Sequence, residues 1–304
     1  MPGKGSSGPW QRLKPVELDP LDSIGLPSKG DTRLLDYKTQ ERYYTKIVER
    51  YLSFCSDAGD RDSLLQSFAS LSITKAGEDV SPTPSTPAAA GTLSRPAPKA
   101  SSPAMSTDAK ALSDVLMALR KLREGIVASK RADDFAAQAY LFCIRLSVLV
   151  QQPESYHPAI LHLLRSVHPR HPLTPLELRE ATGYLVLDAA CRRGRLDEAY
   201  ALRRHWALRD PKVDAVLRAL ARDNYVAFRR IRRGVDGHVA RMMDFAEAGV
   251  RRHALKCFGR AYLSVDVGFL ERTTGLSWDE LVAEGVGWKL EGDRVIIRSI
   301  KGRS

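Results

Sequence analysis

Residues 267–297, with the sequence VGFLERTTGLSWDELVAEGVGWKLEGDRVII, decide the fold of the C-terminal part of this chain. The pattern predicts a short helix over residues 267–272, a turn at Thr273-Thr274-Gly275 and a second helix over residues 277–283. Two strands follow, over residues 288–290 and 294–297. Helix, turn, helix and hairpin is the order of a winged helix. The alternative is a plain helical hairpin with a C-terminal β-arm.

Three local signals favour these boundaries. Gly275 fits a helix C-terminus, because a left-handed residue there satisfies the last carbonyl groups. Ser277 and Glu280 form the pattern of a capping box, in which each side chain takes one unpaired amide at the helix start. The step Gly292-Asp293 favours a tight hairpin turn.

The chain before this stretch is one helical pattern after another. Apolar residues recur at helical spacing, with Thr174 as an expected N-cap and Pro175 at the first helical position. We expect helices over residues 112–128, 135–150, 156–167, 175–192, 196–208, 213–220, 225–233, 239–248 and 252–263. Short connections imply antiparallel neighbours. The predicted fold class is therefore mainly α: an antiparallel helical stack over residues 110–263 that ends in a winged helix over residues 264–299 with a short β-hairpin.

The first third of the chain divides by composition. Residues 1–33 are rich in Gly, Pro, Ser and charge and are expected to be disordered. Residues 34–72 form an amphipathic helical element, with a strong helix over 38–54 and a second short one over 62–71. Residues 73–109 are a Pro/Ser/Thr-rich linker. The candidate docking face of the strong helix is Tyr44, Ile47, Val48 and Tyr51. This face packs either on the chain's own body or on a partner.

The charge of the chain lies in its helical part. The formal net charge is +11, and residues 1–109 are neutral, so residues 110–304 carry the whole excess. Such a charge favours acidic partners or nucleic acid. The chain opens with no secretory signal pattern, and its most apolar run is too short to span a bilayer, so we expect no membrane partner. Four well-separated cysteines fit a reducing cytoplasmic or nuclear compartment.

Catalytic signatures are absent from the sequence. It has no phosphate-binding Gly-rich motif, no nucleophile elbow and no H-E-x-x-H pattern. The histidine pairs His157 with His162 and His168 with His171 lack a Cys or carboxylate at ligand spacing. We therefore expect no enzyme, no cofactor, no metal site and no small-molecule substrate.

Four arginines make the densest positive cluster, which is Arg229, Arg230, Arg232 and Arg233. One interpretation is a patch that contacts phosphate or an acidic partner. The other is a solvated or ion-paired face. The second helix of the expected winged helix carries Asp279, Glu280 and Glu284 nearby and no Lys or Arg, so base reading by that helix is not expected.

Residues 110–304 resemble the PCI-domain family. The resemblance rests on the helical run of residues 135–263, on YLSVDVGFL at 262–270, on LSWDEL at 276–281, on Trp288 and on RVII at 294–297. It is nearest to the small-subunit group that includes COP9 signalosome subunit eight, the small proteasome-lid subunit and translation initiation factor three subunit k. The resemblance implies a noncatalytic scaffold that assembles with other PCI-containing subunits through its winged helix.

The candidate partner interface is Phe269, Leu270, Trp278, Leu281, Trp288, Val295 and Ile297. The same superfamily has a branch in nuclear RNA processing and export whose members bind nucleic acid. An RNA-binding PCI protein, with nonspecific RNA as a partner, is therefore the alternative function.

Overall fold

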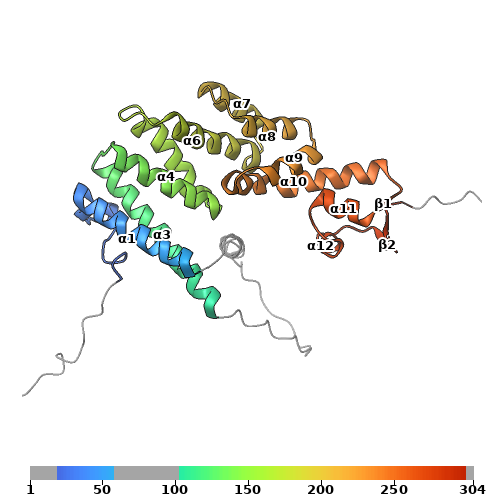
Figure 1. The fold of residues 1–304 in the computed structure, drawn as a ribbon, viewed down its shortest axis with the longest axis horizontal. Helices are drawn as coiled ribbons and strands as arrows, with labels where there is room; N and C mark the ends of the chain where they lie inside the picture. Colours follow the sequence, from blue (N-terminus) through green and yellow to red (C-terminus); the bar gives the residue numbers. More distant parts are fainter. Residues whose placement is uncertain (1–18, 58–102, 299–304) are drawn as a thin grey trace, which may run out of the picture. The chain divides into compact units, whose positions relative to one another are not determined.

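The computed structural model describes residues 19–57 and 103–298, with side chains described for residues 19–56 and 110–298. These residues are mainly helical and end in a small three-stranded antiparallel sheet (Figure 1). The chain divides into two compact units, one up to Ala139 and one from Tyr140. None of the helices in the described ranges has the length and apolar character to cross a bilayer. The helix predicted over residues 62–71 lies outside the described residues.

The first unit is a pair of long helices with an N-terminal segment laid against them. It contains the 3₁₀ helices η2 (Pro27–Lys29) and η3 (Arg33–Leu35), then α1 (Tyr37–Asp57) and α3 (Pro103–Ala128), and α4 (Asp134–Leu149) continues from it into the second unit. Helix α1 packs along α3 (Figure 1). Ile47 is fully buried in this contact, and Tyr44, Val48 and Tyr51 are partly buried. The predicted docking face thus packs on the same chain.

Polar contacts hold the N-terminal segment on these helices. The hydroxyl of Tyr43 and the ammonium of Lys121 both donate to the carbonyl of Leu21, at 2.8 and 3.0 Å. Gly125 allows Leu34 to approach α3, because a Cβ at this glycine would lie 2.7 Å from the Leu34 carbonyl. The segment from residue 19 to residue 35 is therefore ordered, and the predicted disorder of residues 1–33 is wrong for its last 15 residues.

The predicted linker is also too long at its C-terminal end. Helix α3 begins at Pro103, not at residue 110. A proline is well suited to the first turn of a helix, where its missing N–H has no partner to lose. The prediction extended the linker to residue 109 because it treated Pro103 as part of a proline-rich irregular segment. In the structure this proline is the first residue of a helix.

The second unit stacks short helices in chain order. They are α5 (Pro153–His162), the π-helical η4 (Leu163–Val167), α6 (Pro175–Leu187), the π-helical η5 (Asp188–Arg192), α7 (Leu196–His205), α8 (Pro211–Ala221), α9 (Tyr225–Gly234) and α10 (Gly237–Ala261). Thr174 caps α6 in a capping box with Glu177, as predicted for this N-cap. Consecutive helices contact each other, among them α6 with α7, α8 with α9 and α9 with α10.

Helix α10 corrects one predicted boundary. The sequence predicts two helices, over residues 239–248 and 252–263, but the structure has one continuous helix from Gly237 to Ala261. Gly249 lies inside it without breaking it, because a single glycine costs only about 1 kcal/mol in a helix interior. The result is a helix long enough to reach from α9 to the C-terminal sheet.

The chain ends in what we call the C-terminal module, residues 248–298. It consists of the second half of α10, β1 (Ser264–Asp266), α11 (Val267–Thr274), α12 (Trp278–Ala283), β2 (Lys289–Glu291) and β3 (Arg294–Ile296). Strand β3 lies between β1 and β2, and Val295 is opposite both Val265 and Leu290. This order of elements is compatible with a winged helix. The predicted αL residue Gly275 and the capping box of Ser277 and Glu280 are both present.

A buried carboxylate ties η5 to α5 in the second unit. Asp188 has no exposed surface, and it accepts hydrogen bonds from Tyr156 at 2.7 Å, Arg192 at 2.6 Å and Arg193 at 3.0 Å. Burial disfavours its charged form, but the hydrogen bonds from Arg192 and Tyr156 outweigh burial and hold the pKa of Asp188 below its ordinary value. The network therefore stabilises the fold only while Asp188 is ionised.

We expect Asp188→Asn to lower the free energy of unfolding by about 1.5–3 kcal/mol, because the change weakens the charged hydrogen bonds that the partly buried Arg192 and Arg193 make to this carboxylate. Urea denaturation at neutral pH measures the effect. A depressed pKa contributes stability above the unfolded value of about 3.9 and loses it as the pH falls through the folded pKa. The variant should therefore lack part of the acid-induced loss that the parent protein shows.

The matched control for this substitution is Asp197→Asn. Asp197 also pairs with an arginine, Arg195, at 2.8 Å, but both side chains are more than half exposed. Solvent screens such a pair, so this variant should unfold at nearly the same urea concentration as the parent. Equal losses in the two variants would show that burial of Asp188 is not what makes its network matter.

Candidate interaction site

The apolar core of the C-terminal module takes up most of the residues predicted as a partner interface. Leu270, Leu281 and Val295 have no exposed surface, and they pack in one cluster with Ala254, Phe258 and Val265. Trp278, Trp288 and Ile297 are partly buried against this cluster. These six residues are therefore at least partly committed to the module's own folding, and the first three have no surface to offer a partner.

Phe269 is the one member of that predicted set with a largely exposed side chain, at 43%. Its ring meets the buried Phe258 edge to face, with centroids 5.9 Å apart. The ring of Tyr262 also lies against Phe258, with centroids 5.6 Å apart, and the Tyr262 side chain is 47% exposed. Two aromatic side chains thus flank one buried ring and keep much of their own area in solvent.

Other exposed apolar residues of the module were missed by sequence reasoning. They are Leu263, Val282 and Leu290, each between 42% and 49% exposed. In β2 all three residues are exposed, so Leu290 does not follow the alternation that would bury it. These three side chains add exposed apolar area to a module that already exposes Tyr262 and Phe269.

The predicted arginine patch is divided between structure and surface. The guanidinium of Arg229 donates to Glu247 at 2.6 Å and to the carbonyl of Thr274, and its side chain is only 11% exposed. Arg232 pairs with Asp244 at 2.7 Å and with Glu247 at 3.5 Å. These two arginines join α9 to α10 and α11, so neither side chain is a free cation.

Arg230 and Arg233, the other two members of the patch, are exposed.

Gly275 makes room for the side chain of Arg229. Its φ of +75° is left-handed, and a Cβ at this position would collide with the Arg229 guanidinium. The C-cap glycine of α11 therefore also makes room for the arginine of α9.

The acidic character of α12 persists in the structure. The backbone amide of Ser277 donates to Glu280 at 2.8 Å and lowers the pKa of that carboxyl. Glu284 accepts from Arg251 of α10 at 2.7 and 3.0 Å. Asp279 is exposed. A phosphate backbone would be repelled along this helix, as expected from the sequence.

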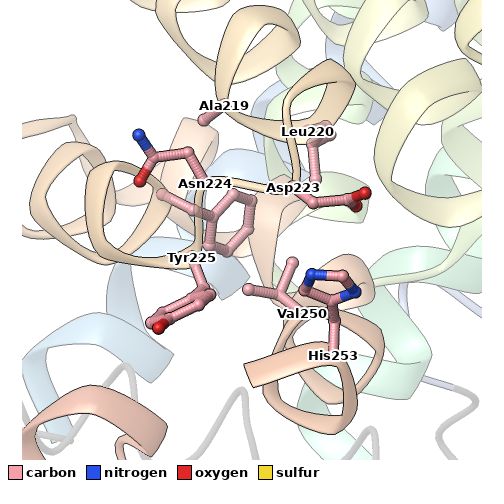
Figure 2. Close-up of a pocket in the computed structure, with 8 residues that line it drawn as sticks. Ala219, Leu220, Asp223, Asn224, Tyr225, Val250 and His253 are labelled. Carbon is pink, nitrogen blue, oxygen red and sulfur yellow. The ribbon is translucent and has the colours of Figure 1, made fainter. Parts of the chain in front are cut away.

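A small hollow lies between α9 and α10. Figure 2 shows Val250 and His253 of α10 beside Asp223, Asn224 and Tyr225, where α8 connects to α9. Its volume is about 20 Å³, which is room for about one water molecule. The hollow is a packing defect between helices rather than a site for a substrate.

A larger open groove of about 390 Å³ runs between α5 and α7. It is lined by His157, Arg193, Glu198 and Trp206, among others. The Nδ1 atom of His157 lies 3.5 Å from Asp188, and burial lowers the pKa of this histidine. The lining residues include no Ser, Thr or Cys that could act as a nucleophile.

The histidine pairs considered for metal binding have other contacts. His162 stacks on Tyr140 with ring centroids 5.0 Å apart, and His168 accepts a hydrogen bond from the amide of Leu173 at 3.0 Å. Within residues 19–57 and 103–298, no three His, Cys, Asp or Glu residues gather closely enough to hold a metal ion.

A comparison with models of known protein families finds no match, and a comparison with curated proteins finds none either.

We expect Arg229→Ala to destabilise the protein by about 3–5 kcal/mol, since it leaves the partly buried Glu247 without its closest cation. The neighbouring Arg230→Ala is the control, because Arg230 is exposed on the same helix and should change stability by no more than about 0.5 kcal/mol. Chemical denaturation of both variants distinguishes a structural arginine from a surface one. Similar small effects would contradict the structural role of Arg229.

Proposed function

We propose that this chain is a noncatalytic interaction scaffold of the PCI type, a subunit of a multisubunit complex that assembles through a C-terminal winged helix. The observation that carries the proposal is the exposed aromatic pair Tyr262 and Phe269, whose rings both lie against the buried ring of Phe258. Leu263, Val282 and Leu290 are further exposed apolar side chains of the C-terminal module. Water-exposed aromatic and aliphatic groups on a small folded unit gain free energy when a partner covers them.

Two further features support a protein partner. The order α10, β1, α11, α12, β2, β3 matches a winged helix, while the acidic α12 opposes its use as a DNA-reading helix. Helices before the module stack side by side, as in a scaffold. The partners we propose are other PCI-containing subunits in the cytoplasm or nucleus, where four separated cysteines stay reduced.

The alternative, RNA binding through Arg229–Arg233, loses its main support in the structure. Arg229 and Arg232 are held in ion pairs with Glu247 and Asp244. An RNA contact through them would have to break pairs that join α9 to α10. We therefore do not propose the four-arginine patch as a nucleic-acid site.

The test is affinity purification of the tagged chain beside a Phe269→Asp variant. The parent should retain stable PCI-containing partners at mild salt. The amount of partner recovered with the variant should be at least about tenfold lower, because a charge in the centre of an interface is costly. Tyr200→Asp is the control, since Tyr200 is 37% exposed on α7, outside the module.

Circular dichroism checks that both variants are folded. Leu281 is buried, so the Leu281→Asp variant should differ from Phe269→Asp. It should lose its partners because the module itself unfolds. A parent protein that remains a monomer without stable partners at mild salt would overturn the proposal.

A further inference from the structure

The second half of α10 has one face that carries only small and cationic residues. Arg252, Lys256 and Arg260 follow one another at intervals of four residues, and all three are exposed. Four residues advance a helix by about 6 Å and turn it by only about 40° past a full circle. The three charges therefore form one stripe, about 12 Å long, on the same side of the helix.

The other faces of this half-helix are occupied. Ala254 and Phe258 are buried in the core of the module. Val250 and His253 line the hollow beside α9 (Figure 2). Trp288 lies 3.7 Å from the place of a Cβ on Gly259. The packing of the second unit thus leaves the cationic face uncovered.

The stripe cations are free of acidic partners. Among the described residues, no side-chain hydrogen bond or ion pair engages Arg252, Lys256 or Arg260. Arg251, the neighbour of Arg252, differs, since it pairs with Glu284 and is 11% exposed. Residues 248–261 contain no Asp or Glu at all. Their positive potential is therefore not cancelled within this half of the helix, and the two carboxylates of the first half, Asp244 and Glu247, pair with arginines of α9.

A fourth cation extends the stripe at its C-terminal end. The guanidinium of Arg298 donates to the carbonyl of Arg260 at 2.7 Å, and its side chain is exposed. This contact fixes the end of β3 beside the last turn of α10 and adds a second arginine next to Arg260. Arginine is suited to phosphate, because its planar fork of donors matches two oxygen atoms at once.

The composition of the face distinguishes between classes of polyanion. Protein interfaces have an apolar centre with aromatic anchors, and membrane-surface helices insert apolar side chains. Within α10, the exposed residues along this face offer neither; they are Ala248, Gly249, Arg252, Lys256 and Arg260. The exposed Leu263 lies beyond the end of the helix, where its carbonyl accepts a hydrogen bond from the amide of Arg298. Interfaces with nucleic acid are polar and strongly positive, and most of their contacts go to phosphates.

We propose that Arg252, Lys256, Arg260 and Arg298 form a binding surface for the phosphate backbone of nucleic acid, used without regard to base sequence. The surface lies on the same module as the exposed aromatic pair Tyr262 and Phe269. Three of its cations belong to α10, whereas Tyr262 follows that helix and Phe269 lies in α11. It is also distinct from the four-arginine patch of α9, two members of which are ion-paired. The proposal does not depend on the identity of the protein partners.

The experiment measures binding of the full chain to a fluorescent single-stranded oligouridylate by anisotropy over a series of salt concentrations. The test variant is Arg252→Glu/Lys256→Glu/Arg260→Glu. The control is Arg204→Glu/Arg209→Glu/Arg222→Glu, which changes the charge equally at three exposed arginines away from the stripe. A triple Gln variant of the stripe removes the cations without adding carboxylates, in case the Glu variant folds poorly.

We expect both stripe variants to bind the oligouridylate at least about tenfold more weakly at low salt. The slope of log K against log salt should fall by about two, from roughly 0.7 per lost phosphate contact. The control triple should keep the parent's slope, and a mixed-sequence RNA should bind like oligouridylate.

Several results would overturn the proposal. The parent protein failing to bind RNA at low salt is one, and equal weakening by the stripe and control triples is another. Polyglutamate or anionic phosphatidylserine vesicles that bind the parent as tightly as RNA, with the same sensitivity to the stripe, would assign the surface to an acidic protein or a membrane instead.

Discussion

The buried ring of Phe258 is the contact that joins α10 to α9, to the start of β1 and to α11. The ring is 1% exposed and meets Tyr225 of α9, Tyr262 and Phe269, with centroid distances between 5.6 and 6.2 Å. One side chain of α10 thereby contacts the preceding helix, the entry to β1 and the first helix after it. A large aromatic group buried at such a junction contributes more than its area alone, because its neighbours pack against its edge and face.

Because α10 is continuous, its different faces contact different elements. Towards α9 the helix presents Asp244 and Glu247, which pair with Arg232 and Arg229. Towards the sheet it presents Ala254 and Phe258. The first half of α10 also packs on α6 and η5. In the second half, the remaining face is left to solvent, where an unpaired Lys or Arg is tolerated. The fold therefore permits the basic stripe but does not require its charge.

Local chemistry in the sequence was enough to predict the start of α6, the end of α11 and the start of α12. Thr174, Gly275 and the pair Ser277 with Glu280 act through neighbours within four residues, so their roles follow from spacing alone. Long-range pairing was not predictable in the same way: Glu247 lies 18 residues from Arg229, and Thr274 lies 45 residues from it. Strand β1 has only three residues, which is too short a run for its alternation of polar and apolar side chains to distinguish it from the end of a helix.

The contrast between local signals and long-range contacts also explains why most residues predicted as a partner interface lie in the module's own core. Apolar residues at helical spacing identify a face that must be covered, but not what covers it. In this module Leu270, Leu281 and Val295 cover one another, since a three-stranded sheet and three helices close on a single small cluster. So small a core cannot bury every apolar side chain of the chain segment that forms it, because surface grows relative to volume as a unit shrinks. The remainder is Tyr262, Leu263, Phe269, Val282 and Leu290, and a partner that covered these side chains would lower the free energy by removing their apolar area from water.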